Sequence, residues 1–133
     1  MHIQVVTPEK VLLDEEADEV IIPTTSGEIT VLPHHIPLVS QIAPGIMIIK
    51  RHGHEDDMVI QGGFIQITDT VIRVLADYAV AGKDVSVAQA EEAKRRAEKA
   101  MREKTSEKEV LMAETELQRA ILELKAATRK GSH

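Results

Sequence analysis

The sequence contains no cysteine and no tryptophan, and it has only one tyrosine and one phenylalanine among 133 residues. Without thiols the chain has no disulfide, no thiolate nucleophile and no cysteine-ligated zinc. An aromatic content of 2% argues against aromatic cages and against sites that bind single-stranded nucleic acid by stacking on its bases. We therefore expect a function that needs neither cysteine chemistry nor aromatic recognition.

An excess of basic charge and a long apolar run are also missing. Lys and Arg number 16 against 22 Asp and Glu, and the resulting net charge of -6 argues against nucleic acid as a partner. No stretch approaches the roughly 18 apolar residues of a membrane-spanning helix, and the first residues lack the basic region of a signal peptide. We expect a bacterial or organelle-encoded protein that is either cytoplasmic and soluble or bound to a membrane only through partners.

Composition and charge change together near residue 83, which indicates two parts. The first 82 residues contain six of the seven glycines and all five prolines, with 4 basic against 12 acidic residues. From Lys83 onward there are 12 basic and 10 acidic residues. The predicted domains are residues 1–84 and 85–133.

In the first part, short runs of Val, Ile and Thr are separated by turn residues. This spacing leaves no room for crossover helices and predicts an antiparallel β-sandwich with an aliphatic core. A polar connection is expected at 51–57 and an interruption at Gly62-Gly63. The predicted strands are 3–7, 20–22, 29–32, 46–50, 58–60, 64–67 and 71–75.

In the second part, the apolar period becomes helical. Alanines recur three and four residues apart, and Ser86 and Ser106 each begin a capping box. The pattern predicts an antiparallel two-helix hairpin, with helices near 87–103 and 107–129 that break at Lys104-Thr105. The fold class is therefore α+β, strands first. The first helix offers mainly alanine methyl groups to its neighbours, so it buries little apolar surface. The hairpin therefore either detaches as a unit or stays packed on the sandwich, and the sequence favours neither.

No residue pattern indicates an enzyme of its own. There is no Gly-x-Ser-x-Gly motif, and Gly82-Lys83 lacks the rest of a phosphate-binding loop. His52 and His54 would face the same way on a strand and suggest a metal-dependent barrel enzyme as a minor alternative. The adjacent Glu55 and the polar surroundings favour a hairpin loop instead, so we expect no metal site and no catalytic residue.

Two further groups leave alternatives open. His34-His35 lies between Pro33 and Pro37, where a histidine serves either loop structure or partner contact. The basic residues of the helices are interleaved with glutamates and form either a solvated face or, near the end of the chain, a patch for an acidic partner. The residues of that patch are Lys125, Arg129 and Lys130.

Several segments resemble the epsilon subunit of F-type ATP synthases. The most distinctive is SGEITVLPHHIPL at 26–38, and the resemblance continues through RHGHE at 51–55 and QGGFIQI at 61–67. It extends through VIRVLAD at 71–77 and EAKRRAE at 92–98, and thereafter rests on pattern and length.

The resemblance implies a non-catalytic rotor subunit, present once per complex, on the cytoplasmic face of a bacterial membrane or the equivalent face in an organelle. The sandwich would bind the gamma subunit and the c-ring, with Glu28 near the c-ring and His35 against gamma. The helical arm would extend toward the alpha and beta subunits and restrain ATP hydrolysis. Its basic positions that would meet acidic segments there are Arg119, Lys125, Arg129 and Lys130.

One departure concerns nucleotide binding. Some relatives bind ATP at the start of the first helix through an Asp and an Arg, whereas Ser86 and Gln89 stand at those positions here. Arg96 remains, but one arginine is a weak anchor for a polyphosphate. We expect weak or absent ATP binding and no cofactor. The alternative function is a free-standing β-sandwich that binds a ligand or senses a nucleotide.

Overall fold

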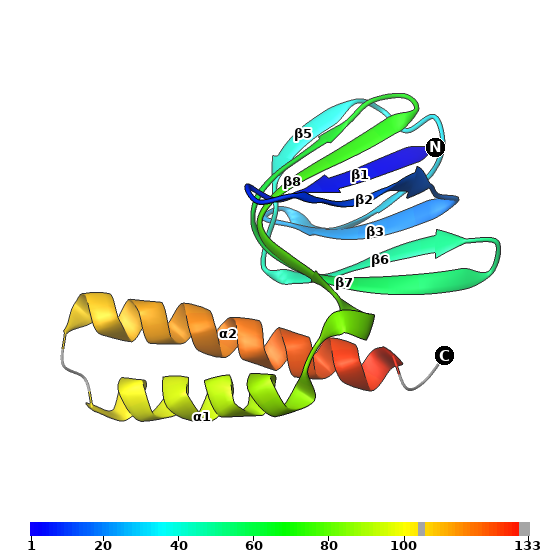
Figure 1. Ribbon diagram of the computed structural model, residues 1–133. Coiled ribbons are helices and arrows are strands. Elements are labelled where there is room, and N and C mark those ends of the chain that lie inside the picture. Colours follow the sequence, from blue (N-terminus) through cyan, green and yellow to red (C-terminus); the bar gives the residue numbers. More distant parts are fainter. Residues whose placement is uncertain (104–105, 131–133) are drawn as a thin grey trace. The chain divides into compact units, whose positions relative to one another are not determined.

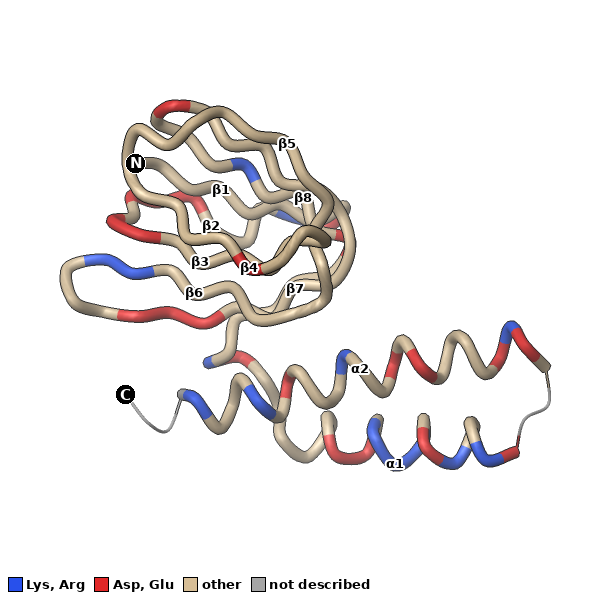
Figure 2. The backbone as a smooth tube through the Cα atoms, turned by 180° about the vertical axis from the view of Figure 1, so that it is seen from behind, with Lys and Arg blue, Asp and Glu red and all other residues tan. Residues whose placement is uncertain are grey.

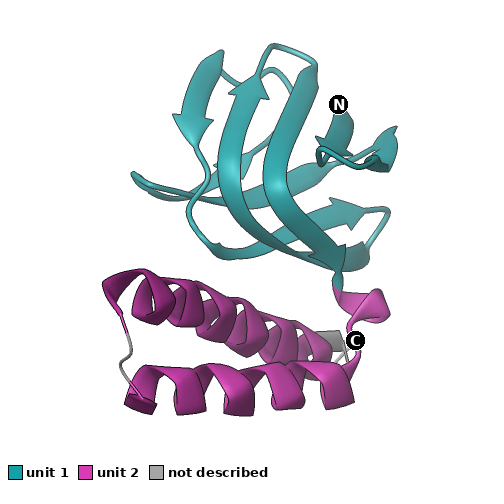
Figure 3. Ribbon diagram, turned by 60° about the vertical axis from the view of Figure 1, so that its left-hand side comes forward, with its two compact units in different colours: residues 1–81 teal, residues 82–133 magenta. Residues whose placement is uncertain are grey.

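The computed structural model describes residues 1–103 and 106–130; Lys104 and Thr105, where the helix break is expected, lie outside the described residues, as do 131–133 and the side chain of Lys130. The chain divides after residue 81 into two compact units (Figure 3). Unit 1 consists of strands and unit 2 of helices. This confirms the predicted α+β order of the fold.

Unit 1 is an eight-stranded β-sandwich (Figure 1). The strands follow the order β2-β1-β8-β7-β6-β3-β4, and β5 pairs with β7. Their bounds are β1 His2–Val6, β2 Val11–Glu16, β3 Glu19–Thr24, β4 Gly27–Val31, β5 Leu38–Gln41, β6 Gly45–Arg51, β7 His54–Ile67 and β8 Val71–Ala81.

The core is aliphatic because side chains alternate between the two faces of each strand. Every second residue of β1, of β3 and of β8 up to Ala76 is buried, and the intervening ones are partly or fully exposed. The largest fully buried side chains are all Ile, Val or Met, and the single phenylalanine is not among them. The predicted aliphatic core of Val, Ile and Leu is correct for Val and Ile, whereas these largest buried side chains include Met47 and no leucine.

Three features of the sheet differ from the sequence-based prediction. Strands β2 and β5 were not predicted, because β2 ends in three acidic residues and β5 has only four residues directly after Pro37. The sandwich is also not wholly antiparallel, since β1 pairs with β8 in parallel. These two strands lie at opposite ends of the unit's sequence, so their direction is set by tertiary packing.

The glycine pair at Gly62-Gly63 does not interrupt β7. It lies where the strand leaves β6, its partner up to Ile60, and begins to pair with β5 at Phe64. Both glycines have positive φ, 75° and 104°. A Cβ on Gly63 would lie 2.0 Å from the carbonyl oxygen of Leu75, so only glycine permits this bend and close approach.

Unit 2 contains a short 3₁₀ helix, η1 Gly82–Asp84, and the helices α1 Val87–Glu103 and α2 Glu107–Lys130. Both predicted capping serines are in place: Ser86 Oγ accepts from the Gln89 amide at 3.3 Å and Ser106 Oγ from the Glu109 amide at 3.1 Å. The most buried side chains of the helices are alanines: Ala90, Ala97, Ala113, Ala120 and Ala126. Small side chains let two helices approach closely, as a hairpin requires.

Candidate partner-binding surface

A row of apolar side chains crosses the outer face of unit 1. Val11 of β2 pairs with Val6 of β1, Val6 with Leu75 of β8, and Leu75 with Phe64 of β7. Strand alternation places these residues on the side opposite the core, since Val5, Val74 and Ile65 are buried. We call Val6, Val11, Phe64 and Leu75 the outer apolar row.

The outer apolar row is exposed to an unusual degree for such residues. Phe64 is 53% exposed, Leu75 52% and Val11 55%. Contiguous apolar surface of this kind marks a protein-binding site, and aromatic residues contribute most to such interfaces. This row was not predicted from the sequence, although the alternation in FIQI already places Phe64 on the face opposite Ile65.

The segment between β4 and β5 adds to the exposed apolar surface. Ile36 is 79% exposed and Val39, on β5, 68%. His35, one of the predicted contact residues, is half-buried, and its Nδ1 donates to the Ile36 carbonyl at 2.7 Å. Its neighbour His34 adopts φ 66° and donates its amide to the Asp69 carbonyl at 3.1 Å. This loop therefore has a defined backbone that displays Ile36.

Glu28, the predicted c-ring contact, lies on β4 just after a tight turn. Thr24 closes that turn, because its Oγ1 donates to the Gly27 carbonyl at 2.6 Å and accepts the Ser26 amide at 3.2 Å. Gly27 takes φ 113°, which glycine adopts without strain. The Glu28 side chain is exposed. A carboxylate is thus displayed at the end of a hairpin and is available to a partner.

The candidate nucleotide residues of the arm are engaged within unit 2. Ser86 uses its hydroxyl to cap α1, as described above. The guanidinium of Arg96 binds Glu116 of α2, with Nε 3.1 Å from Oε1 and Nη2 on the same oxygen. A phosphate would have to compete with Glu116 for Arg96.

The four basic positions of the arm do not form one cluster. Lys125 and Arg129 are four residues apart and share a helix face, whereas Arg119 lies about 120° around the axis from Lys125. Lys125 is exposed, and Arg119 and Arg129 are half-buried. The side chain of Lys130 lies outside the described residues.

The two histidines of the metal alternative do not lie on one strand face. His52 is in the turn between β6 and β7, with φ 51°, and its amide donates to Asp18 at 2.8 Å. His54 begins β7, and its Nε2 lies 3.2 Å from Asp56. Within residues 1–103 and 106–130, no three His, Asp or Glu side chains are placed to hold a metal ion. The premise of alternating strand positions is therefore wrong.

Charges are distributed differently in the two units (Figure 2). Unit 1 is mainly acidic, and Lys50 on β6 pairs with Glu19 at 3.0 Å and with Glu55 at 3.6 Å. The hydrogen bond to Glu19, reinforced by Glu55, raises the pKa of the Lys50 ammonium above its usual value. The helices of unit 2 carry both signs of charge along their length. No helix in the described part of the chain is long and apolar enough to cross a bilayer.

Comparison with known proteins identifies the family of both units. The beta-sandwich domain of the ATP synthase delta/epsilon chain matches residues 1–82, and the long alpha-helix domain of the same chain matches residues 83–128. Each domain of the family thus corresponds to one structural unit.

Relatives of similar length match nearly the whole chain. The ATP synthase epsilon chain of Chromobacterium violaceum is 39% identical over 127 residues, 94% of this chain and 91% of its own length. That of Desulforamulus reducens is 39% identical over 126 residues, 95% of this chain and 96% of its own.

A solved structure agrees with the sequence relatives. A chain in the cryo-EM structure of the Euglena gracilis mitochondrial ATP synthase, OSCP/F1/c-ring, superposes with a TM-score of 0.80 at 26% identity and covers 95% of this chain and 79% of that one. A central stalk/c-ring chain of the Tetrahymena thermophila enzyme has the same fold, with a TM-score of 0.63 at 16% identity. The chain therefore belongs to the ATP synthase delta/epsilon family, as a rotor-stalk subunit of the epsilon type.

Proposed function

We propose that the outer apolar row binds the gamma subunit of an F-type ATP synthase and that the Glu28 turn contacts the c-ring. In this way unit 1 links ion-driven rotation of the ring to the central stalk without catalysing a reaction. The observation that carries the proposal is the exposure of Phe64, Leu75 and Val11 on adjacent paired strands. The matched assembly from Euglena, which contains F1 and the c-ring, supports this choice of partners.

The physical basis is burial of apolar surface in a rigid frame. The four residues of the outer apolar row come from four hydrogen-bonded strands, so they are held in place before a partner arrives. Pre-organised apolar side chains lose little conformational entropy on binding, and this favours affinity. His35 and Ile36, in the loop before β5, extend the contact to a second segment of gamma.

The test is binding of the full chain to its gamma subunit, measured by surface plasmon resonance. Phe64→Glu places a charge in the middle of the row and should weaken binding by about 30-fold or more, the loss that marks an interface hot spot. Thr30→Glu is the control, because Thr30 is exposed on β4, in a different part of the sheet. Equal affinity of Phe64→Glu and wild type would refute the proposed face.

A second part of the proposal concerns unit 2, which restrains ATP hydrolysis by meeting acidic segments of the catalytic subunits. Its helices have their own N-caps and pack through their own buried alanines. The hairpin therefore does not depend on unit 1 for its helical form. The exposed Lys125 supplies basic charge near the end of α2.

Truncation of the chain after Lys83 tests this role in the assembled complex. We expect assembly and coupled synthesis to persist and ATP hydrolysis to rise, because unit 1 retains the partner surface. Lys125→Ala should raise hydrolysis in the same direction, with the exposed Lys99→Ala on α1 as its control. Unchanged hydrolysis in the truncated complex would limit unit 2 to a structural role.

The proposed site of action is the cytoplasmic face of a bacterial membrane, or the equivalent face in an organelle, where the subunit is held through the complex. ATP is not a cofactor in this proposal, because Ser86 and Gln89 supply no charge and Arg96 is bound to Glu116. Isothermal titration calorimetry of the full chain with Mg-ATP should show no binding below millimolar concentrations. Micromolar affinity would contradict this part and favour a nucleotide-sensing role.

A further inference from the structure

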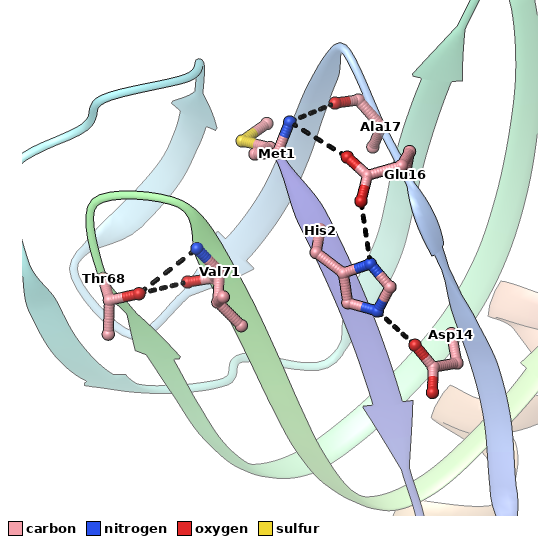
Figure 4. A network of polar contacts seen from close by, with 7 residues as sticks. All are labelled: Met1, His2, Asp14, Glu16, Ala17, Thr68 and Val71. Atoms are coloured by element: carbon pink, nitrogen blue, oxygen red, sulfur yellow. Dashed lines mark hydrogen bonds and ion pairs between the residues drawn. The ribbon is translucent and has the colours of Figure 1, made fainter.

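His2 lies between two carboxylates of the neighbouring strand. It begins β1, and Asp14 and Glu16 project from β2 on either side of its ring (Figure 4). The ring Nδ1 is 3.0 Å from Glu16 Oε1, and the ring Nε2 contacts Asp14 Oδ1. Both ring nitrogens therefore face a carboxylate oxygen.

This geometry requires a particular protonation state. A neutral imidazole has one N–H donor and one lone pair, whereas the imidazolium has two donors. In the neutral form, one nitrogen lone pair would point at an anionic oxygen, and that contact is repulsive. Only the imidazolium of His2 can donate to Asp14 and Glu16 together.

We propose that His2, Asp14 and Glu16 form a pH-sensitive latch, which holds strand β2 on β1 while His2 is protonated and loosens it when His2 becomes neutral. Strand β2 is suited to such control because it ends the strand order and, within the described residues, pairs only with β1. The β1–β2 register also shifts between Val5 and Val6, which weakens the ladder beyond the latch. Side-chain bridges thus matter more here than in the middle of the sheet.

Basic groups also lie near His2 and its two carboxylates. Within the described residues, the Met1 nitrogen is 3.6 Å from Glu16 Oε2, and Arg73 of β8 is paired with Gln4, next to His2 on the same face. A cavity of about 430 Å³ opens beside the latch and gives water access for proton exchange. Its lining residues are Met1, His2, Glu16, Pro33, His34, Asp69, Thr70 and Val71. Across it, His34 Nδ1 lies 3.3 Å from the Asp69 carboxylate.

The pKa directions agree with the geometry. The hydrogen bonds that His2 donates to Glu16 and then to Asp14 raise the pKa of His2 above its usual value of 6.5. The His2 hydrogen bond in turn lowers the pKa of Glu16 below its usual 4.5. The His2 contribution is fully present below pH 6.5 and is lost as pH rises through the raised pKa, whereas the Glu16 contribution is present above pH 4.5 and is lost as pH falls through the lowered pKa. The latch is therefore closed in the mildly acidic range and opens as pH rises above it.

The experiment is NMR on the full chain, without an N-terminal extension that would alter the surroundings of Glu16. Ring ¹⁵N shifts of His2 report its protonation, and the amide of Ala17, which donates to the Met1 carbonyl at 2.8 Å, reports the β2 end of the hairpin. The Ala17 protection factor should fall about two- to fivefold as His2 loses its proton, the change that exposed ion pairs give. His2→Gln should remove this pH dependence and lower protection at pH 6 by the same factor.

Two variants separate the latch from a general effect on folding. Asp14→Asn removes one carboxylate, so the pKa of His2 should fall while the fold is retained. His54→Gln is the matched control, because His54 contacts a single carboxylate in the β6–β7 hairpin; it should leave the Ala17 amide unchanged. A His2 ring that is already neutral at pH 6, or a pH dependence of Ala17 that survives in His2→Gln, would overturn the proposal.

Discussion

Arg51 and Glu15 join two strands that are not neighbours in the sheet. Nη1 of Arg51, on β6, lies 3.4 Å from Oε2 of Glu15, on β2. In the strand order, β1, β8 and β7 stand between β2 and β6, so the ion pair closes the sandwich across its open side. Glu15 pairs with the core residue Ile3, which places the carboxylate on the inner face, and its Oε1 is buried without a hydrogen-bond partner in the described structure.

Removal of Arg51 should therefore lower the free energy of unfolding more than neutralisation of Glu15 does. Arg51→Met leaves the Glu15 carboxylate partly buried and unpaired, and we expect the free energy of unfolding to fall by about 1–2 kcal/mol. Glu15→Gln keeps the size and relieves the buried charge, so the loss should be smaller. Urea unfolding, followed by NMR at amides of β2 and β6, measures both. A larger loss for Glu15→Gln than for Arg51→Met would contradict this account.

The bend in β7 should tolerate no side chain. Gly63→Ala combines a positive φ with a Cβ 2.0 Å from the Leu75 carbonyl oxygen, so stability should fall by about 3 kcal/mol or more. Gly53→Ala is the matched control, because Gly53 also has positive φ but nothing lies within 4 Å of its Cβ position; about 1 kcal/mol is expected. Thermal unfolding of both variants gives the comparison, and similar losses would show that the close approach to β8 is not decisive.

The buried alanines of unit 2 should not tolerate larger side chains. Ala97 is 1% exposed, so Ala97→Leu overpacks the hairpin and should destabilise it by about 1–3 kcal/mol. Ala88→Leu, at an exposed position of the same helix, should change stability by less than about 0.5 kcal/mol. Amide hydrogen exchange in α1 and α2 distinguishes the two; equal protection in both variants would mean that the helices are not closely packed at Ala97.

The Arg96–Glu116 pair links the helices of the hairpin at an exposed site. A double-mutant cycle with Arg96→Ala and Glu116→Ala should give a coupling energy of about 0.2–1 kcal/mol, because water screens such pairs. The same Glu116→Ala protein also tests nucleotide binding, since it frees Arg96. If Glu116 is what blocks the guanidinium, Mg-ATP affinity in calorimetry should rise relative to wild type; no rise would assign the weak binding to Ser86 and Gln89.

The local sequence pattern was sufficient to predict the helices and strands that their own residues determine. The serine caps and alanine spacing set both helices close to their observed bounds, and β-branched runs located six of the strands. Strand β2 was not predicted because its final acidic residues are typical of a loop. In the sheet, these residues are stabilised by His2 and Arg51 from other strands. Likewise, the local sequence at Gly62-Gly63 predicts the end of a strand. Only the change of pairing partner from β6 to β5 explains why β7 continues.

By itself the sequence determined the α+β order, the aliphatic core, the two capped helices and the resemblance to a rotor subunit, since each depends on residues close together in the chain. The tertiary structure decided which apolar side chains stay outside, the parallel pairing of β1 with β8, and the meetings of His2 with Asp14 and of Arg51 with Glu15. These depend on strand register, and register is fixed by the burial of a whole face at once, which no local pattern specifies.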